Sequence, residues 1–533
     1  MTQNKDAISF LIENGLSTDE ITKYLSDGIS VDELVTAVQG LVSRRESVSS
    51  DNQSVKPADF SDAGNAEVFS REYSQQLAYV DSMGWLYWSG KKWERNEHKA
   101  LLMAVEFSAR LRMEAMEEYK AALQAEAVAK ANNPEGGEEV KKVVEKTKQA
   151  KAFLAHANNT RRAARIKAIL ELSKPNLYVP GSAMDANPVE LNTAGGIIDL
   201  RTGERKCHRQ SSYCTMITAE TKDADDAAEI WQTFLDVITC DNEELKVFLQ
   251  MIVGMALFGK VYHEGIVFAV GDGRNGKSTF FNAVGAVLGD YTGYINIDVI
   301  TTKGSGDKAA LATLRGKRMV IAGELEEGRR LSAATVKKLA STDPFQVEEK
   351  YKQPEIINPS HTLFLFTNHL PRVSSTDLGT WRRILNVPFN AVIDSAQSVQ
   401  NFGDILAQNV SGAILTWALE GARRFAEREY HLDIPQCVKV ATEEYRRREN
   451  WLANFIDECC EVGPDFRAQA KILYAEYRTW AENAGEYIRC EKDFSNEMDR
   501  LGYMKIKPKN IKHYVGLKLR LAELVGYGKV TAV

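Results

Sequence analysis

The chain has 533 residues, of which 67 are basic and 73 acidic, and it is 44% apolar and 26% charged, with a formal net charge of −6. That length exceeds a single hydrophobic core and predicts about three or four domains of roughly 150 residues each. The mildly acidic balance excludes a protein that binds polyanions through its bulk charge, so any nucleic-acid surface must be local.

Membrane insertion, secretion and disulfide stabilisation are not expected. No apolar run approaches the roughly 20 residues that cross a bilayer, and the N-terminus lacks the basic start and apolar core of a secretion signal. The seven cysteines are scattered and none stands in a CxxC pair. Cys207, His208 and Cys214 come nearest to a metal cluster, but no second ligand pair accompanies them, and we expect ordinary thiols and a cytoplasmic protein.

The first 45 residues hold a short internal repeat, “NGLSTDEI” from Asn14 and “DGISVDEL” from Asp27. In each copy a glycine can end one helix, and a serine with a glutamate three residues later can start the next. The pattern predicts a small helical module that suits a docking appendage better than a catalytic part. The polar, serine-rich stretch that follows is expected to be a flexible linker.

Strands and long helices are predicted next. “LAYVDSMGWLYWSGKKWERN” is typical of short strands joined by glycine turns, with Trp85, Trp88 and Trp93 expected in the core rather than stacked on bases. Residues 98–173 are rich in Ala, Glu, Lys and Leu and are interrupted by “ANNPEGGEE”. This segment predicts two long helices that form a hairpin.

A second mixed segment, “ELNTAGGIIDLRTGERKCHRQ”, predicts a β-hairpin that turns at Thr202 and Gly203. A helical run is expected from Asp226 to Gly259, directly before the most informative part of the chain.

A phosphate-binding loop is predicted after the apolar strand “GIVFAV”. The glycines of “GDGRNGKST” allow the backbone to bend and point its amides at a phosphate, and the helix that starts near Lys277 adds its dipole. Lys277 supplies a charge for the β- and γ-phosphates, and Ser278 supplies a hydroxyl for Mg²⁺. The expected nucleotide-binding residues are Gly271, Asp272, Gly273, Arg274, Asn275, Gly276, Lys277, Ser278 and Thr279.

Two further apolar strands are followed by polar side chains. “RMVIAGELEEG” places Glu324 where its strand should end, so this carboxylate is the first candidate to hold Mg²⁺ and polarise water, with Glu326 as a supporting ligand or a solvated side chain. “TLFLFTNHLP” ends in Asn368, whose amide can orient the attacking water. Because ligands of open α/β sheets bind at the carboxyl ends of the strands, Lys277, Glu324 and Asn368 are expected to lie together.

An arginine pair follows in “GTWRRILNVPF”. Buried adjacent arginines are rare, and we expect Arg382 and Arg383, between Trp381 and Ile384, to be buried in a rigid position. Such a position suits an arginine that completes the nucleotide site of a neighbouring subunit, and the alternative is a structural pair with a carboxylate such as Asp377. The sequence does not separate the two arginines.

The order of these motifs resembles the superfamily 3 helicase domain of phage and plasmid primase-helicases, the group that includes poxvirus-type ATPases. The resemblance covers roughly residues 190–395 and is carried by “GDGRNGKST”, “RMVIAGELEEG”, “VKKLASTDPFQVEEKYKQ”, “LFLFTNHLPRV” and “TDLGTWRRILNVPF”. It implies an AAA+ ring ATPase, usually a hexamer, that uses ATP and Mg²⁺ to move on single-stranded DNA. It also implies a Walker A site at Gly276, Lys277 and Ser278. Glu324 would be the Walker B acid, Asn368 the sensor, and Arg382 or Arg383 the arginine finger.

The same resemblance implies a DNA-contacting loop between the Glu324 strand and the Asn368 strand. Its candidates offer four ammonium groups for phosphates and one ring for a base: Lys337, Lys338, Lys350, Tyr351 and Lys352. Two glutamates stand beside them in “VEEKYK”, and plain surface charge is the alternative for each lysine.

The C-terminal sequence predicts helix, helix and β-hairpin, the order of a winged helix. From Arg500 to Val533 there are eight basic residues against one acid, which is a local basic footprint in an acidic protein. Duplex or origin DNA is the expected ligand and a structural cap is the alternative; phosphate contacts alone would not read a base sequence. The candidates are Lys505, Lys507, Lys509 and Lys512.

The expected fold class is multidomain α/β: an AAA+ P-loop ATPase core, in which helices flank a parallel sheet, with an α+β N-terminal region and a winged-helix-like C-terminal domain. The expected divisions are a helical module (1–45), a linker (46–65), an α+β domain with a long helical hairpin (66–225), the superfamily 3 ATPase domain (226–400), a helical lid or linker (401–455) and the basic domain (456–533).

We therefore expect an ATP-dependent DNA helicase, a Mg²⁺-dependent P-loop NTPase, for replication of a phage, prophage or plasmid in the cytoplasm of a bacterial host. Its expected partners are single-stranded and forked or origin DNA, further copies of itself and a separate primase or polymerase, with no membrane. The alternatives are a bifunctional primase-helicase, a non-unwinding DNA-dependent AAA+ ATPase and a small-molecule kinase. Residues 60–190 show neither an apolar strand ending in Asp-x-Asp nor paired cysteines, which argues against intrinsic primase activity.

Overall fold

The computed structural model describes residues 54–301, 308–323, 325–347, 355–373, 378–394, 399–483 and 487–520. The chain divides into two compact units, the first made of Met1–Tyr79 with Asn96–Tyr178 and the second of Val80–Arg95 with Val179–Val533. The helical module expected over residues 1–45 and the first part of the expected linker lie outside the described residues.

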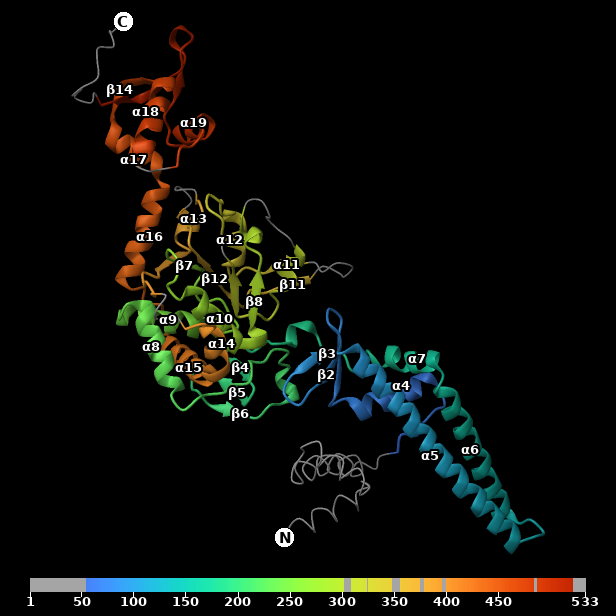
Figure 1. The fold of residues 1–533 in the computed structure, drawn as a ribbon. Helices are drawn as coiled ribbons and strands as arrows, with labels where there is room; N and C mark the ends of the chain where they lie inside the picture. Colours follow the sequence, from blue (N-terminus) through green and yellow to red (C-terminus); the bar gives the residue numbers. More distant parts are fainter. Residues whose placement is uncertain are drawn as a thin grey trace. The chain divides into compact units, whose positions relative to one another are not determined.

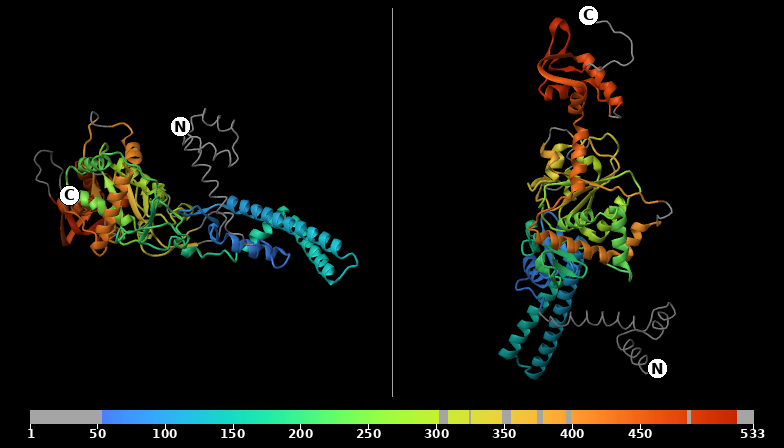
Figure 2. Two further views of the ribbon diagram at one scale, coloured as in Figure 1. Left: turned by 90° about the horizontal axis from the view of Figure 1, so that it is seen from below. Right: turned by 90° about the vertical axis from the view of Figure 1, so that its left-hand side faces the viewer.

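Helices build the described part of the first unit. They are α4 (Asp62–Tyr73), α5 (Glu97–Asn132), α6 (Glu138–Thr160) and α7 (Ala163–Ser173). The Asn96 side chain caps α5 by accepting a hydrogen bond from Lys99 N at 2.9 Å. Helices α5 and α6 run side by side as the expected hairpin (Figure 1 and Figure 2), with Phe107 and Phe153 fully buried. Among the described residues, no helix is long and apolar enough to cross a membrane.

One β-hairpin and one three-stranded antiparallel sheet belong to the second unit. Its first strands are β2 (Gly84–Trp88), β3 (Trp93–Arg95), β4 (Glu190–Thr193), β5 (Gly196–Asp199) and β6 (Arg205–Lys206), and β1 (Leu77–Val80) crosses the boundary between the units. Gly203 N donates to Asp199 O at 2.8 Å in the expected turn between β5 and β6, and the φ of Gly203 is 76°. Trp85 and Trp93 are buried, as expected of core residues, whereas Trp88 at the end of β2 is only half-buried.

A five-stranded parallel sheet is the centre of the second unit. Its order is β13-β7-β12-β9-β8, and all neighbouring strands are parallel. The strands are β7 (Ile266–Val270), β8 (Thr292–Ile295), β9 (Met319–Ala322), β12 (Thr362–Thr367) and β13 (Ile384–Pro388). All four residues of β9 are buried, as in strands that are covered on both faces. The expected α/β core with a parallel sheet is confirmed.

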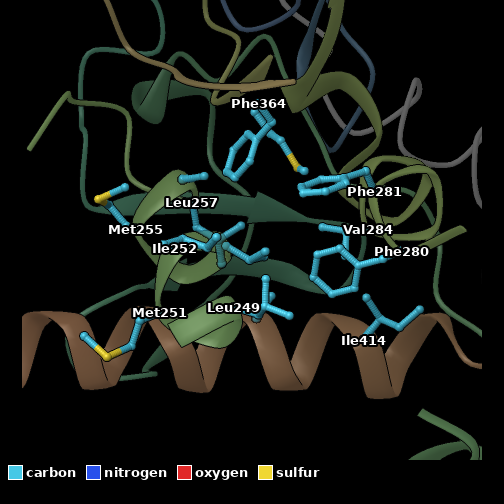
Figure 3. Packing of buried hydrophobic residues seen from close by; sticks show 14 of the residues in the cluster. Leu249, Met251, Ile252, Met255, Leu257, Phe280, Phe281, Val284, Phe364 and Ile414 are labelled. Atoms are coloured by element: carbon cyan, nitrogen blue, oxygen red, sulfur yellow. The ribbon is translucent and has the colours of Figure 1, made fainter. Parts of the chain in front are cut away.

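Helices cover both faces of this sheet, because alternate strand residues enter two separate apolar clusters. One cluster holds Val267 and Phe364 of the sheet together with residues of α10 and α15 (Figure 3). The helices around it are α8 (Ala227–Thr239), α9 (Glu243–Ala256), α10 (Lys277–Leu288), α14 (Phe402–Asn409) and α15 (Ser411–Glu427).

The other cluster holds Phe268 and Leu365. The elements on that side are α11 (Lys308–Ala312), α12 (Ala333–Leu339), α13 (Leu378–Trp381), α16 (Gln436–Glu449) and the antiparallel hairpin of β10 (Phe345–Val347) with β11 (Glu355–Ile357).

Helices α9 and α15 pack so closely that both need glycine. A Cβ atom at Gly254 would lie 2.1 Å from Gly421 C, and one at Gly421 would lie 2.2 Å from Gln250 O. We expect Gly254→Ala to lower the free energy of unfolding by about 1–3 kcal/mol, because the added methyl group forces the two helices apart. Chemical denaturation of the nucleotide-free protein measures this loss.

The matched control is Gly403→Ala in α14, since a Cβ at Gly403 meets nothing within 4 Å. Alanine favours a helix over glycine, so this variant is expected to be neutral or slightly stabilised. Equal losses in the two variants would contradict the close-packing explanation.

The C-terminal described residues form a small core of their own. Its elements are α17 (Trp451–Cys459), β14 (Cys460–Gln469), α18 (Ala470–Asn483), α19 (Glu491–Arg500), β15 (Lys505–Ile506) and β16 (His513–Leu519). The strands form an antiparallel sheet of order β14-β16-β15. Tyr477 and Phe494 are buried beside each other, with ring centroids 5.0 Å apart. The predicted helix, helix and hairpin are present, and α17 and β14 complete the sheet and core.

Candidate active site

The loop between β7 and α10 has the backbone of an anion-binding turn. Gly273, Arg274 and Gly276 have φ angles of 99°, 47° and 78°, and Gly276 is the N-cap of α10. A Cβ at Gly276 would lie 2.4 Å from Ile238 Cγ2, and one at Gly271 would lie 2.2 Å from a backbone oxygen, so both positions require glycine. Left-handed turns beside a helix N-terminus direct backbone N–H groups toward an anion.

Among the described residues, three oxygen atoms accept hydrogen bonds from the ammonium group of Lys277. Its Nζ donates to Gly271 O at 2.6 Å, to Asn275 Oδ1 at 2.8 Å and to Asn368 Oδ1 at 3.2 Å. An ammonium group has three donors and no acceptor, so these contacts can satisfy it completely. The structure thus brings Lys277 and Asn368 together at the carboxyl edge of the sheet.

Asn275 also ties the loop to the end of β13. Its Nδ2 donates to Phe389 O at 3.1 Å, while Phe389 N donates to Val270 O at 2.7 Å and Ile393 N to Arg274 O at 2.9 Å. Asn275 is only 3% exposed. Sequence reasoning placed Asn275 in the loop but did not assign it this bridging position, because nothing local indicates that the chain after β13 returns here.

A cavity of about 910 Å³ opens beside the loop. That volume lies in the range of small-molecule sites. Loop residues from Gly273 to Thr279 and Asn368 form its polar wall. The rest of the lining comes from α8, the segment after β13 and α14, and its apolar members include Ile230, Val237 and Phe402. The sequence analysis missed this part of the lining, since its residues have the spacing of ordinary core positions.

The structure describes two of the three expected metal ligands, Ser278 and Glu326. Ser278 is exposed and lines the cavity, and Glu324 lies outside the described residues, two positions after the end of β9. Glu326 is paired with Arg329 Nη2 at 2.7 Å on the surface. A serine hydroxyl and a carboxylate at the strand end are hard oxygen donors, and Mg²⁺ commonly takes only one or two protein ligands beside phosphates and water. Ser278 therefore offers an oxygen donor of the kind that Mg²⁺ takes, while Glu326 already has a cationic partner.

Cys207 is an exposed free cysteine, and His208 and Cys214 have local surroundings of their own. His208 Nε2 lies 2.9 Å from Thr193 O. Burial raises the pKa of the Cys214 thiol to about 12, so it stays protonated at neutral pH.

Arg382 and Arg383 have different surroundings. Arg383 is 7% exposed, and its Nη2 pairs with Glu264 Oε2 at 2.5 Å while its Nη1 donates to Gly379 O at 2.8 Å. The Arg382 side chain is 68% exposed and lies 3.8 Å from the same carboxylate oxygen. The expectation that both arginines are buried is wrong for Arg382, because Arg383 takes the short contact with Glu264 and the bond to Gly379 O while the Arg382 side chain stays exposed. The carboxylate partner of Arg383 is Glu264, and Asp377 lies outside the described residues.

The arginine pair and the loop lie at opposite ends of the sheet. Ile384, which follows Arg383, pairs with Ile266, the first residue of β7, whereas the loop follows Val270, the last. Five strand residues at about 3.3 Å each separate the two ends by roughly 16 Å. Arg382 therefore lies too far from the loop of its own chain to contact a phosphate there.

The predicted DNA-contacting lysines are only partly described. Lys350, Tyr351 and Lys352 lie outside the described residues, between β10 and β11. Lys337 and Lys338 are in the last turn of α12, and Lys338 Nζ lies 4.8 Å from the centre of the Phe345 ring at the start of β10. This contact places one candidate at the foot of the β10–β11 hairpin.

The basic C-terminal candidates separate into two kinds. Lys505 Nζ bonds to Asp499 Oδ2 at 2.6 Å, so its charge is partly neutralised. Lys507, Lys509 and Lys512 are exposed in the connection between β15 and β16.

Two family models match the chain in succession. The model described as “D5 N terminal like” matches residues 66–240, and the model described as “Family of unknown function (DUF5906)” matches residues 269–383. The second match contains the loop, β9, β12 and the arginine pair.

Several viral proteins are similar to this chain. “Putative helicase L207/L206” of Acanthamoeba polyphaga mimivirus is 27% identical over 240 residues, which are 44% of this chain and 25% of that protein. “Putative primase C962R” of African swine fever virus is 22% identical over 350 residues, which are 58% of this chain and 35% of that protein. The chain thus spans about a third or less of these relatives. Among solved structures, the NrS-1 C-terminal region in its apo form aligns with 56% of this chain and 78% of its own, at 12% identity and a TM-score of 0.34.

Proposed function

We propose that this chain, which belongs to the superfamily 3 helicase-primase family marked by its D5-type and DUF5906 regions, is an ATP-dependent DNA helicase that works as a ring on single-stranded DNA. The carrying observation is the 3.2 Å contact between Lys277 Nζ and Asn368 Oδ1 beside the cavity. In this proposal Lys277, after the loop that follows β7, binds phosphate, and Asn368, directly after β12, orients water. Because β7 and β12 are parallel neighbours, the two side chains lie together.

In this proposal the cavity binds ATP. The loop amides and Lys277 bind the β- and γ-phosphates, which would replace some of the oxygen atoms that now hold the ammonium group. The base lies against the apolar wall that includes Ile230, Val237 and Phe402. The same segments also bring Asp226, Glu229, Thr233 and Gln400 to the cavity, and these side chains offer polar contacts.

Hydrolysis needs a positioned water and charge stabilisation. Asn368 orients the attacking water, while Ser278 and Glu324 would hold Mg²⁺ and Glu326, paired with Arg329, would remain a surface side chain. The metal ion, when bound, neutralises charge that develops on the phosphates.

We assign the arginine finger to Arg382. It is exposed and at the far end of the sheet from its own loop, so it is available to a neighbouring copy, whereas Arg383 is occupied by Glu264. A ring of identical subunits, a hexamer in this proposal, gives each nucleotide site a finger from the next subunit. The finger stabilises the transition state in trans.

DNA contacts are assigned to two places. Lys337, Lys338, Lys350, Tyr351 and Lys352, on and beside the β10–β11 hairpin, would track single-stranded DNA. The C-terminal domain, with the helix and strand order of a winged helix, would hold duplex or origin DNA.

Triple substitution of Lys507, Lys509 and Lys512 by alanine is expected to weaken duplex binding for all base sequences. Three lost phosphate contacts lower the slope of log affinity against log salt by about 3. Fluorescence anisotropy over a salt series measures this slope. The matched control is Lys518→Ala, since Lys518 Nζ is paired with Glu461 at 2.8 Å; an equal slope in the triple variant and the wild type contradicts the assignment.

The proposed activity is tested by ATP turnover with and without single-stranded DNA, by unwinding of a forked duplex and by mass measurement with an ATP analogue. We expect DNA-stimulated turnover, strand separation and a ring-sized particle. Turnover that ignores DNA in a protein that stays monomeric would overturn the proposal. Stimulated turnover without unwinding would identify a non-unwinding DNA-dependent ATPase.

The biological setting that we propose is replication of a phage, prophage or plasmid in bacterial cytoplasm, with a separate primase or polymerase. The primase name belongs to a relative of which this chain spans 35%. Incubation with template DNA and nucleotides tests the alternative, because a primase-helicase would yield short primers by itself.

A further inference from the structure

Glu264 stands between the arginine pair and the segment that carries the hairpin. Its Oε2 atom lies 2.5 Å from Arg383 Nη2 and 3.8 Å from Arg382 Nη2. Its other oxygen, Oε1, lies 3.4 Å from Thr342 Oγ1. The two oxygens of one carboxylate therefore face two different parts of the second unit.

Thr342 belongs to the foot of the hairpin, which we define as residues 341–345. The foot connects α12 to β10, and Asp343 N donates to Ser341 Oγ at 3.1 Å within it. Phe345, the first residue of β10, carries Lys338 Nζ over its ring. A movement of the hairpin or of Lys338 can therefore reach the foot through β10, while β11 leads on to β12 of the sheet.

The backbone beside Glu264 is fixed, while its side chain is 35% exposed. Ile266 N donates to Arg383 O at 2.7 Å, and Gly265 N donates to His263 O at 2.8 Å, so two backbone hydrogen bonds hold this turn. Burial lowers the pKa of His263, and its Nε2 atom has no hydrogen-bond partner among the described residues. His263 thus adds no positive charge that competes with the arginines for the carboxylate.

We propose that Glu264 is a positioning residue that transmits DNA occupancy of the β10–β11 hairpin to the orientation of Arg382. Arg383 holds one oxygen of the carboxylate, and Thr342 contacts the other, so a movement of the foot moves the carboxylate. The electrostatic attraction between Glu264 and the exposed Arg382 then changes the orientation of Arg382. The inference rests on the proposed helicase function and adds to it a route by which DNA controls the site of the next subunit.

The test uses the full chain with Glu264→Gln, which keeps the size of the side chain and removes its charge. We expect the ratio of DNA-stimulated to basal turnover to fall about tenfold, a usual size for coupling between two sites, with unchanged affinity for an ATP analogue. Glu420→Gln is the matched control, because Glu420 pairs with Arg423 at 2.8 Å and Arg424 at 3.0 Å on α15. Its ratio is expected to equal that of the wild type.

Thr342→Val is the second variant, and it leaves both arginines paired as they are. It is expected to lower the same ratio by a smaller factor, about threefold. If Glu264→Gln proves unstable, Thr342→Val tests the inference by itself. An unchanged ratio of DNA-stimulated to basal turnover in Thr342→Val overturns the inference.

Subunit mixing separates this inference from the helicase proposal. Lys277→Ala subunits keep an intact Glu264 and Arg382, so mixing them with Glu264→Gln subunits is expected to restore stimulated turnover at mixed sites. No restoration would show that Glu264 does not act through the finger. A wild-type protein that is never stimulated by DNA would instead overturn the proposed function, and a stimulated wild type with an equally stimulated Glu264→Gln would overturn only the inference.

Discussion

Replacement of Lys277 by alanine is expected to stop ATP turnover, with kcat lowered by about 10³-fold, the usual cost of removing a fixed charge from a transition state. The Lys277 ammonium group lies 2.6 Å from Gly271 O and 3.2 Å from Asn368 Oδ1, and in the proposed site it binds the γ-phosphate. A coupled phosphate-release assay measures kcat, and a fluorescent ATP analogue measures the expected loss of affinity.

Lys439→Ala on α16 is the matched control, because Lys439 is an exposed lysine outside the cavity. It is expected to leave turnover unchanged. Normal turnover in Lys277→Ala would mean that the loop does not bind the hydrolysed nucleotide.

Arg382→Ala is expected to lose ATP turnover, whereas Arg383→Ala is expected to lose stability. Loss of an arginine finger lowers kcat by about 10³-fold or more, and because Arg382 is exposed its removal should leave the thermal unfolding temperature unchanged. Arg383→Ala leaves the Glu264 carboxylate without its closest partner. Since Glu264 is partly exposed, the expected loss of unfolding free energy is about 1–3 kcal/mol rather than the larger cost of a fully buried pair. Thermal unfolding and turnover, measured on both variants, separate the two roles.

A mixture of Arg382→Ala and Lys277→Ala tests where the finger acts. Neither variant alone has a complete site, but a mixed ring contains sites with an intact Lys277 from one subunit and an intact Arg382 from the next. We expect turnover to reappear on mixing. Its absence at every ratio of the two variants would contradict a shared site.

The loop and the sheet could be predicted from the sequence because their signals are local. The glycines around Lys277 follow an apolar strand, and Asn368 ends another, so neighbouring residues alone indicate strand, turn and helix order. The parallel pairing of β7 with β12 then brings these two side chains together.

The roles of the two arginines could not be predicted in this way. Both stand in the same apolar surroundings in sequence, and only the approach of Glu264, which is 119 positions away along the chain, distinguishes Arg383 from Arg382. The same applies to the cavity wall from α8 and α14 and to the bond from Asn275 to Phe389, since each depends on tertiary contacts between distant segments.

Strand β13 connects the arginine pair to the segment that contacts the loop between β7 and α10. Its first residue, Ile384, follows the arginine pair, and Phe389, just after its last residue, accepts the bond from Asn275 in the loop. In the proposed ring, a change of nucleotide in one subunit would shift one end of this stiff strand, and the other end would carry the shift to the finger in the adjoining site. Neighbouring sites would then hydrolyse ATP one after another around the ring. The delay between one hydrolysis event and the next would depend on how a single β-strand transmits the shift.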